Sequence, residues 1–345
     1  MAACCFIGEY ASGNRGGALI ALIITPLLSW LLCGVYLRVA RRWQILDRPN
    51  ERSSHQLPTP HGAGLPLFLA LALGVFAAIA LGVSWLADYY VLLGIAACLV
   101  IVGVFDDLRG LSVQLRFAVY GLGCVLAVFC LLDPLQTGDT MVLAGAALAV
   151  VALLWMLNLY NFMDGIDGYA ASQCVLACCG AALLAWGTGP SPDYSLFCLL
   201  LAAVHVGFLF WNWPPARLFM GDAGSIPTGF LLGALALLGE AQGYLPLACW
   251  LIMLGVFITD ASATLLWRIV TGQPFTQPHR LHAYQRLSRR LGGHLPVVLV
   301  LVALNVLWLL PLAFLVALFP KYSILLVILA YLPLIGGMAK VKEFG

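Results

Sequence analysis

The feature that most constrains this chain is a succession of apolar stretches, many close to twenty residues long, that recur along its whole length. A bilayer core of about 30 Å is crossed by roughly 20 apolar residues in helical form. Only 9% of the 345 residues are charged, whereas an ordinary soluble domain carries about 25%. The sequence therefore predicts an all-α polytopic membrane protein. It excludes a soluble multidomain enzyme, a disordered protein and a basic nucleic-acid-binding protein.

We count eleven candidate transmembrane helices, and ten is the alternative count because several apolar stretches are short or interrupted by Gly and Pro. They lie at about residues 17–39, 62–86, 89–105, 115–132, 140–157, 168–187, 194–211, 224–239, 246–267, 295–318 and 323–339. No shift in composition marks a second domain, so residues 1–345 are expected to form one integral membrane domain. The stretch before Gly17 lacks the ordered regions of a cleaved signal peptide.

Positive charge is distributed unevenly between the predicted loops. With the N-terminus outside and the C-terminus in the cytoplasm, all but two of the seventeen Lys and Arg residues face inward, and only Arg15 and Lys321 lie outside. Cytoplasmic loops carry such an excess in membrane proteins. The charges therefore predict this orientation and, with it, an odd number of spans. The predicted cytoplasmic loops are about 40–61, 106–114, 158–167, 212–223 and 268–294.

Acidic residues cluster at the inward ends of the predicted spans. Asp106 and Asp107 close the third span. Asp164 and Asp167 follow the fifth span, and Asp222 follows the seventh. Adjacent carboxylates against a membrane face are costly unless a cation offsets them. The pattern therefore predicts a hard metal ion at this face, with an anionic substrate bound through it.

The segment NLYNFMDGIDG (158–168) places polar residues at every third position, namely Asn158, Asn161, Asp164 and Asp167. On an α-helix, neighbours three apart share a face, whereas the first and last of these four point in opposite directions. A tighter turn, or a break at one of the two glycines, would bring all four together. A polar cap on a helix end is the alternative, but the spacing favours a binding site.

Two further segments precede predicted spans at the inward face. FMGDAGS (219–225) would present free N–H groups and one carboxylate at a helix start, which suits phosphate and metal together. A plain N-cap by Asp222 is the alternative interpretation. The Pro- and Gly-rich stretch 47–64, which contains Arg52 and His55, is longer than a simple connector requires.

The basic inward segment HRLHAYQR (279–286) contains His279, Arg280 and His282. Two histidines three residues apart, with no third ligand nearby, are a weak zinc signal, and cationic groups beside them suit a diphosphate better. A merely solvated basic loop is the alternative. Asp260 lies about 12 Å along a helix from Arg268, and it either lines a cleft near the cytoplasmic face or makes a packing hydrogen bond.

Together these segments resemble the polyprenyl-phosphate N-acetylhexosamine-1-phosphate transferase superfamily, which is glycosyltransferase family 4. The resemblance rests on five ordered motifs: DRPNERSSH–PTP (47–60), the DD pair (106–107), NLYNFMDGIDG (158–168), FMGDAGS (219–225) and the histidine loop (279–287). The loop sequence HRLHAYQRL resembles the branch that initiates O-antigen and related polysaccharides. Relatives usually read PTPRGGG where this chain has PTPHGAG, so His61 and Ala63 replace an arginine and a glycine. A phosphate contact made by that arginine is therefore not carried over.

The resemblance implies an enzyme that transfers N-acetylhexosamine 1-phosphate from a UDP-sugar to undecaprenyl phosphate, giving undecaprenyl-diphospho-sugar and UMP. It implies Mg²⁺ as the cofactor, with Mn²⁺ as an alternative metal. It places the enzyme in the bacterial cytoplasmic (inner) membrane, with the site facing the cytoplasm, and is compatible with a homodimer. Nucleic acid is not an expected partner. We expect direct attack by the lipid phosphate rather than an aspartyl-phosphate intermediate.

The resemblance also implies roles for individual residues. Asp222 and Asp107 are expected to bind the metal, and Asp106 or Asp107 to deprotonate or position the lipid phosphate. The candidate catalytic residues are Asp106, Asp107, Asp164, Asp167, His279 and His282. The candidate substrate-binding residues are Asn158, Asn161, Phe219 (against uracil), Arg280, Arg52, His55 and Arg116.

A secondary transporter with intramembrane carboxylates is the alternative function, and it predicts acids near the middle of the bilayer. The acids lie instead at the ends of the predicted spans, and no internal repeat is visible. A CDP-alcohol phosphotransferase fails on its own motif, because Ser172 replaces the arginine of DxxDGxxAR and no later aspartate pair follows. A non-catalytic relative is not favoured, because all the expected metal-binding acids are present.

Overall fold

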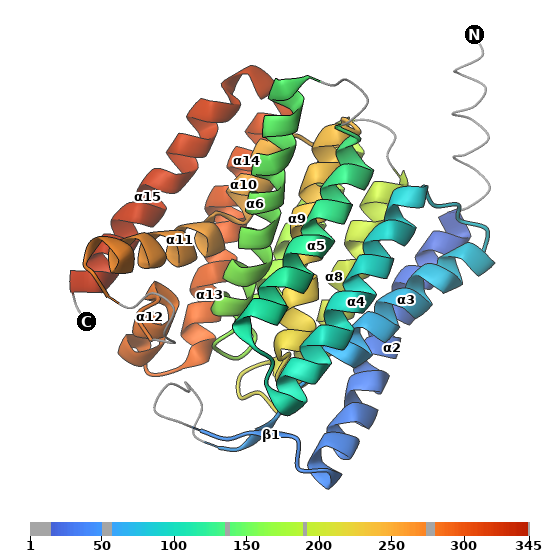
Figure 1. The fold of residues 1–345 in the computed structure, drawn as a ribbon, viewed down its shortest axis with the longest axis vertical. Helices are drawn as coiled ribbons and strands as arrows, with labels where there is room; N and C mark the ends of the chain where they lie inside the picture. Colours follow the sequence, from blue (N-terminus) through green and yellow to red (C-terminus); the bar gives the residue numbers. More distant parts are fainter. Residues whose placement is uncertain (1–14, 50–56, 135–138, 189–191, 274–279, 344–345) are drawn as a thin grey trace.

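A computed structural model describes residues 15–49, 57–134, 139–188, 192–273 and 280–343 (Figure 1). Each of the eleven predicted apolar stretches is helical. The helices are α2 (Arg15–Arg42), α3 (Gly64–Ala80), α4 (Ala87–Arg109), α5 (Val113–Leu132), α6 (Thr140–Met163), α7 (Tyr169–Thr188), α8 (Pro192–Asn212), α9 (Asp222–Ala241), the pair α10 (Leu247–Met253) and α11 (Gly255–Val270), the continuous run of α13 (His294–Leu304), η1 (Asn305–Leu309) and α14 (Leu310–Leu318), and α15 (Ser323–Glu343). The predicted all-α membrane fold is confirmed.

Not every one of these helices is long enough to cross a bilayer. Within the described ranges, nine are long and apolar enough, and the bent pair α10–α11 makes a tenth if it counts as one span. The helix α3 is apolar but has only 17 residues. Side chains that face outward from the bundle are themselves apolar, with Ile324 80% and Leu307 75% exposed, as a lipid-facing surface requires. Eleven crossings therefore stays a prediction, as does the orientation of the termini.

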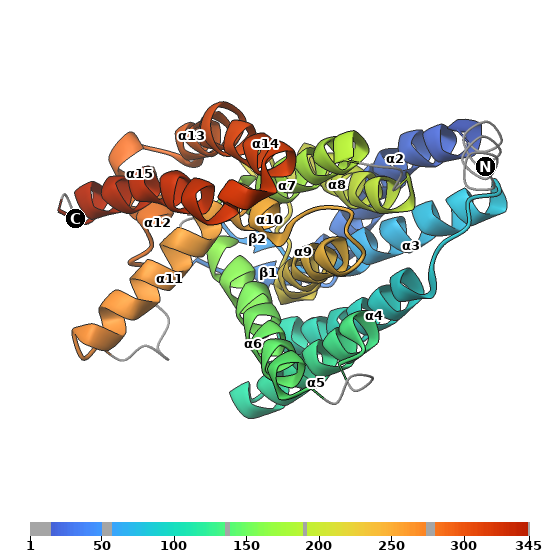
Figure 2. The same cartoon turned by 90° about the horizontal axis from the view of Figure 1, so that it is seen from above.

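The helix α9 lies at the centre of the bundle, and Figure 2 shows the other helices grouped around it. Most of its residues are buried. Glycines allow this position, because a Cβ at Gly229 would lie 2.8 Å from the Leu157 Cα of α6, and one at Gly233 would meet the Leu153 side chain at 2.7 Å. Small residues four apart on one face let two membrane helices approach closely. The first turn of α9 is thereby held inside the bundle.

The ninth predicted span is broken in the structure. The helices α10 and α11 meet at Leu254 and differ in direction by 73°, so α11 runs across the bundle rather than along it (Figure 1). The break frees a carbonyl group at Met253, and the buried Gln173 amide of α7 donates to it at 2.9 Å. The candidate span at 246–267 is therefore bent rather than one straight helix, and a side chain from another helix satisfies the broken backbone.

The predicted cytoplasmic loops gather at one end of the bundle, the lower end in Figure 1. We call this the acidic end; there α4, α6 and α8 finish and α5, α7 and α9 begin. Two short strands, β1 (Leu46–Asp47) and β2 (Thr59–Pro60), pair antiparallel at this end. A short amphipathic helix, α12 (Ala283–Leu291), precedes α13 in the chain and contacts α11, α13 and α15. The grouping agrees with the charge pattern, whereas the side of the membrane it faces stays a prediction.

Candidate active site

Three helices bring their polar termini together at the acidic end. The C-terminal part of α4 packs directly on the first turn of α9, because Gly103 lacks a side chain and a Cβ there would overlap the Ala223 Cα. Gly64, at the start of α3, is equally close to the backbone of Ala223. The end of α6 lies against the same turn through Asn161, which donates to Asp222. The acids of three motifs, far apart in the chain, therefore meet in one cluster.

Asp106 and Asp222 share one cation. Arg116, in the first turn of α5, donates from Nη1 to Asp106 Oδ2 at 2.6 Å and to Asp222 Oδ2 at 3.3 Å. The second oxygen of Asp106 accepts from the Leu111 backbone at 2.6 Å. The shorter distance indicates that the hydrogen bond of Arg116 to Asp106 is the stronger of the two. The structure thus places Arg116 in the cluster, where a protein cation offsets part of the acidic charge, and its predicted role in substrate binding stays a prediction.

Asp107 binds the start of α9. Its Oδ1 accepts from the backbone N–H of Asp222 at 3.0 Å, and its Oδ2 from that of Ala223 at 3.2 Å. A carboxylate is favoured there because the first N–H groups of a helix have no partner within the helix and carry partial positive charge. Gly221 precedes the helix with φ of 71°, and a Cβ there would meet Asp107 Oδ2 at 2.6 Å. Asp107 therefore caps α9 from another helix, and its role as a metal ligand stays a prediction.

Asp164 differs from the other acids of the cluster. The Asn161 amide donates to Asp222 Oδ1 and to Ser225 Oγ, both at 2.8 Å, but among the described residues no group donates a hydrogen bond to the Asp164 carboxylate. Burial raises the pKa of Asp164 well above the ordinary carboxyl value, and the negative charge of Asp222 adds to the shift. A carboxylate held in this way is stabilised by a cation that binds it.

Asp167 fixes the loop that leads to α9. Its Oδ2 accepts from the Ala216 backbone at 3.0 Å and lies 3.1 Å from His294 Nδ1, at the start of α13. The backbone N–H of the next residue, Gly168, donates to the Asn212 side chain at 2.9 Å. The second aspartate of the NFMDGIDG segment therefore lies apart from the Arg116 pair, and it joins three elements at the edge of the cluster.

His282 is held by Asp260. Asp260 Oδ1 and Oδ2 accept from the backbone N–H groups of Ala283 and Tyr284, each at 2.9 Å, and His282 Nδ1 lies 3.3 Å from Oδ1. The His282 ring stacks on Phe162, which follows Asn161 in α6, with centroids 6.4 Å apart. Asp260 therefore caps α12 and orients His282. Of the two interpretations from the sequence, the structural hydrogen bond describes Asp260.

The segment PTPHGAG runs beside FMGDAGS. The Phe219 N–H donates to the Pro60 carbonyl at 2.8 Å, and the Ala63 N–H donates to the Phe219 carbonyl at 3.1 Å. His61 has its Nδ1 3.9 Å from Asp107 Oδ1. Burial lowers the pKa of His61, against the opposing effect of Asp47 and Asp222. Burial therefore disfavours the charged form of this imidazole, and Ala63 beside it in the chain is fully buried.

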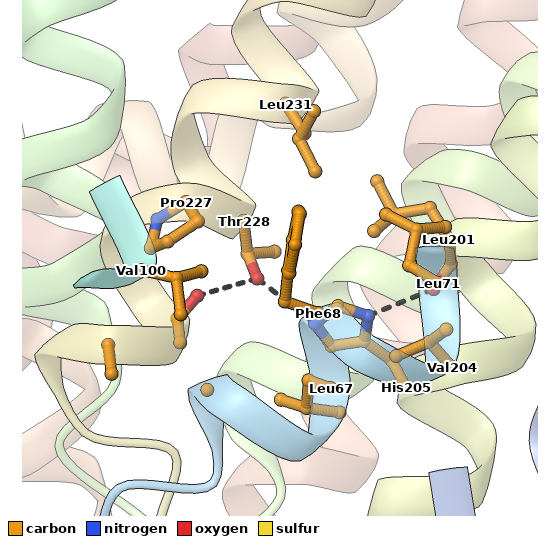
Figure 3. A pocket seen from close by; sticks show the side chains of 13 residues that line it. Leu67, Phe68, Leu71, Val100, Leu201, Val204, His205, Pro227, Thr228 and Leu231 are labelled. Carbon is orange, nitrogen blue, oxygen red and sulfur yellow. Dashed lines mark hydrogen bonds between the residues drawn. The ribbon is translucent and has the colours of Figure 1, made fainter. Parts of the chain in front are cut away.

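An apolar pocket lies behind the first turns of α9, between α3, α4 and α8 (Figure 3). Its one ionisable side chain is His205, whose Nε2 lies 3.2 Å from Thr228 Oγ1 and whose Nδ1 lies 2.9 Å from the Leu201 carbonyl. Thr228 in turn donates to the Gly224 carbonyl at 2.8 Å. These hydrogen bonds connect α8 to the first turns of α9, the helix that begins at Asp222.

The sequence of this chain is similar to a family model and to several known proteins. The sequence model described as glycosyl transferase family 4 matches residues 89–240. A phospho-N-acetylmuramoyl-pentapeptide-transferase of Geobacillus kaustophilus is 30% identical, over 72% of this chain and 81% of the relative. The chain belongs to glycosyl transferase family 4. A probable undecaprenyl-phosphate N-acetylglucosaminyl 1-phosphate transferase of Bacillus subtilis is 28% identical, over 82% of this chain and 80% of the relative. A decaprenyl-phosphate N-acetylglucosaminephosphotransferase of Mycobacterium leprae is 26% identical with the same coverage.

These relatives confirm the family that the five motifs predicted. They include both N-acetylglucosaminyl and muramoyl-pentapeptide transferases, so membership of the O-antigen-initiating branch of the glycosyl transferase family stays a prediction. The family match covers the DD pair, the NFMDGIDG segment and FMGDAGS.

The acidic cluster of this family member suits a hard divalent cation. Among the described residues, no group of three or more His, Cys, Asp or Glu side chains is arranged to hold a metal. Magnesium ions need only one or two carboxylates, because waters and substrate phosphates complete the octahedron. Asp164, with no hydrogen-bond donor to its carboxylate in the described part of the chain, and Asp222 supply such oxygens. The donor set therefore fits Mg²⁺.

Some predicted residues lie apart from the cluster or outside the described ranges. The Asn158 amide donates to the Leu154 carbonyl of its own helix at 2.7 Å. The Arg280 carbonyl accepts a hydrogen bond from Arg289 of α12 at 3.3 Å. Arg52, His55 and His279 lie outside the described residues. Their roles, and those of Asn158 and Arg280, stay predictions.

Sequence reasoning did not single out three residues that the structure places at the site. His294 contacts Asp167, the Tyr284 hydroxyl donates to the Phe162 carbonyl at 2.9 Å, and the buried Tyr120 lies one helical turn beyond Arg116. The spacing of Tyr120 from Arg116 was a usable signal, because residues four apart share a helix face. The other two contacts join segments more than 100 residues apart, and no local pattern reports them.

Proposed function

We propose that this protein transfers N-acetylhexosamine 1-phosphate from a UDP-sugar to undecaprenyl phosphate, releasing UMP. The observation that carries the proposal is the cluster of Asp106, Asp107, Arg116, Asp164 and Asp222 at the ends of helices long enough to cross a membrane. One substrate is a membrane lipid and the other a soluble nucleotide, so the reaction needs charged groups at that boundary. The Bacillus subtilis and Mycobacterium leprae relatives are named for transfer to polyprenyl phosphates.

The proposed reaction is a direct displacement. An oxygen of the lipid phosphate attacks the β-phosphorus of the UDP-sugar, a new P–O bond forms, and the bond between that phosphorus and the UMP oxygen breaks. A phosphate monoester has a second pKa near 6, so most of the lipid phosphate is already dianionic at pH 7. The reaction therefore demands positioning and charge neutralisation more than a general base.

The protein's own groups divide this work. Arg116 is the cation of the cluster, and Asp106 orients it through the contact of 2.6 Å. Asp107 keeps the first turn of α9, and with it Asp222, against the end of α4. Asp222 and Asp164 would hold Mg²⁺, which when bound supplies positive charge to the diphosphate oxygens. An offset of this kind matters because the cluster holds four carboxyl groups, and Arg116 pairs with only two of them, Asp106 and Asp222.

Three further groups, Phe219, Asp167 and His282, are our candidates to bind the nucleotide and the sugar. Phe219 leads into the Asp222 turn, and it is our candidate to stack on uracil. Asp167 offers acceptor oxygens at the edge of the cluster, and His282, fixed by Asp260, is our candidate for the sugar or diphosphate. We further propose that the site faces the cytoplasm of a bacterial inner membrane, as the loop charges predict, and that the product initiates O-antigen or a related polysaccharide.

The test is UMP release by the purified protein in detergent, with undecaprenyl phosphate, Mg²⁺ and a panel of UDP-N-acetylhexosamines that starts with UDP-N-acetylglucosamine. We expect release that requires the lipid and stops when EDTA is added. Release without the lipid would contradict the acceptor assignment, and full activity in EDTA would contradict the metal. Mn²⁺ in place of Mg²⁺ should restore activity after chelation.

A further inference from the structure

The polar groups around the carboxylate cluster are nearly all committed to one another. Arg116 bonds to Asp106 and Asp222, Asn161 to Asp222 and Ser225, and Asp107 to the backbone of α9. Among the described residues there are two exceptions, namely the Asp164 carboxylate, to which no group donates a hydrogen bond, and the hydroxyl of Tyr120. The Tyr120 hydroxyl is buried, and within the described part of the chain it has no hydrogen-bond partner. The whole Tyr120 side chain is only 3% exposed.

Tyr120 lies against the cluster rather than elsewhere on its helix. It follows Arg116 by four residues in α5, so the two side chains share a face. The charged groups of the cluster, Asp106, Asp107, Arg116 and Asp222, lie close enough to act electrostatically on its hydroxyl. A buried hydroxyl without a partner is costly. Its persistence beside a charged site points to a ligand that supplies the missing acceptor.

The depth of Tyr120 indicates which substrate supplies this acceptor. The helix α5 begins at the acidic end and runs into the bundle, so Tyr120 lies about 6 Å further along the helix axis than Arg116. A soluble nucleotide-sugar reaches the cluster from the aqueous end, whereas a polyprenyl phosphate reaches it from the membrane side. The oxygens of a phosphate monoester accept hydrogen bonds, and a hydroxyl group can donate one.

We infer that the Tyr120 hydroxyl donates a hydrogen bond to the phosphate of the lipid acceptor, beside the Arg116 cation, and positions it for attack. This inference rests on the proposed function and adds a residue to it. Arg116 supplies charge, while Tyr120 supplies a directed donor on the membrane side of the same phosphate. The two side chains would together distinguish the acceptor phosphate from those of the nucleotide.

The test compares Tyr120→Phe with the wild-type enzyme, with lipid concentration expressed as mole fraction in mixed micelles. A hydrogen bond to a charged group is worth about 10- to 100-fold in affinity. We therefore expect the KM for undecaprenyl phosphate to rise by about that factor, with kcat and the KM for the UDP-sugar little changed. Because the variant removes an unsatisfied hydroxyl, its thermal midpoint should not fall.

A binding measurement separates this inference from the proposed function. Farnesyl phosphate, as a short polyprenyl phosphate, should raise the thermal midpoint of the wild-type protein, and this stabilisation should be weaker in Tyr120→Phe while that by UMP is retained. Tyr89→Phe is the matched control, because Tyr89 is fully buried near the start of α4, at the opposite end of the bundle. If wild type responds and Tyr120→Phe responds equally, the inference is wrong. If neither farnesyl phosphate nor UMP stabilises wild type, the proposed function itself is wrong.

Discussion

The substitution Asp107→Asn separates the structural from the catalytic duties of the acidic pair. Each Asp107 oxygen accepts one backbone N–H at the start of α9, at 3.0 and 3.2 Å. Asparagine keeps one acceptor, but it turns its amide N–H₂ group toward the second backbone donor. The variant therefore loses one hydrogen bond, loses the negative charge at the helix terminus, and leaves one buried N–H without a partner.

The expected cost follows from these three losses. A hydrogen bond to a charged acceptor contributes about 1.5–3 kcal/mol, and a buried N–H left without a partner costs about 1–3 kcal/mol. Burial raises the pKa of Asp107 to about 6, so the loss of its charge adds little to this cost. These losses overlap, and we expect Asp107→Asn to lower the free energy of unfolding by about 2–4 kcal/mol. At roughly 2 °C per kcal/mol for a chain of this size, the thermal midpoint should fall by about 4–8 °C.

The matched variant is Asp222→Asn, in the same cluster. Its remaining oxygen can still accept from Asn161, and the Arg116 contact that it weakens is the longer one, at 3.3 Å. Removing one of several adjacent negative charges also relieves repulsion. We therefore expect an unchanged or higher midpoint together with a loss of turnover of at least about 100-fold, as removal of a key electrostatic group typically causes. The two midpoints are measured by following the fluorescence of the protein in detergent on heating.

Equal midpoints for the two variants would refute the assignment of Asp107 as the cap of α9. Normal turnover in Asp222→Asn would refute the metal assignment. A double variant adds a check, because residues in direct contact should show non-additive losses.

Three further predictions concern groups around the cluster. Arg116→Gln should reduce kcat/KM by at least about 100-fold, and Arg116→Lys should reduce it less, because lysine keeps the positive charge. Equal kcat/KM values for Arg116→Gln and the wild-type protein would contradict the role of the cation. Because the folded state raises the pKa of Asp164, the folded protein holds a proton that the unfolded chain releases as pH rises above about 4. The Asp164 carboxyl group therefore lowers the stability of the folded protein as pH rises in this window. Asp164→Asn should raise the thermal midpoint in EDTA more at pH 8 than at pH 5. An increase in midpoint that is smaller at pH 8 than at pH 5 would contradict this pH dependence. Asp260→Asn should weaken the start of α12 and loosen His282, seen as faster backbone hydrogen exchange over 283–291 with α9 unaffected.

The helices could be predicted almost entirely from the sequence, because the length and hydrophobicity of a span are local properties. The break at Leu254 could not, since it depends on the Gln173 amide reaching the Met253 carbonyl from another helix. The stretch 246–267 has no proline between Leu247 and Gly255 that would mark the bend. The bend is stabilised by a hydrogen bond from a distant part of the chain, and predictions from local sequence do not report such a contact.

The types and the location of the site residues could also be predicted, whereas their pairing could not. The positions of Asp106, Asp107 and Asp222 at helix ends indicated charged chemistry at one face. That Asp107 caps α9, while Asp106 holds Arg116, depends on contacts across more than 100 residues for the first and on side-chain direction for the second. The sequence interpretation assigned the offsetting charge to a metal alone, and the structure adds Arg116.

The central claim is that a phosphate moves together with the sugar, and one measurement tests it most directly. UDP-N-acetylhexosamine labelled at the β-phosphate is incubated with the purified protein and undecaprenyl phosphate, and the lipid is extracted. The account predicts that the label enters the lipid fraction while unlabelled UMP remains in water. Label that stays in the aqueous phase as UDP, with unlabelled sugar on the lipid, would show transfer of the sugar alone and would contradict the account.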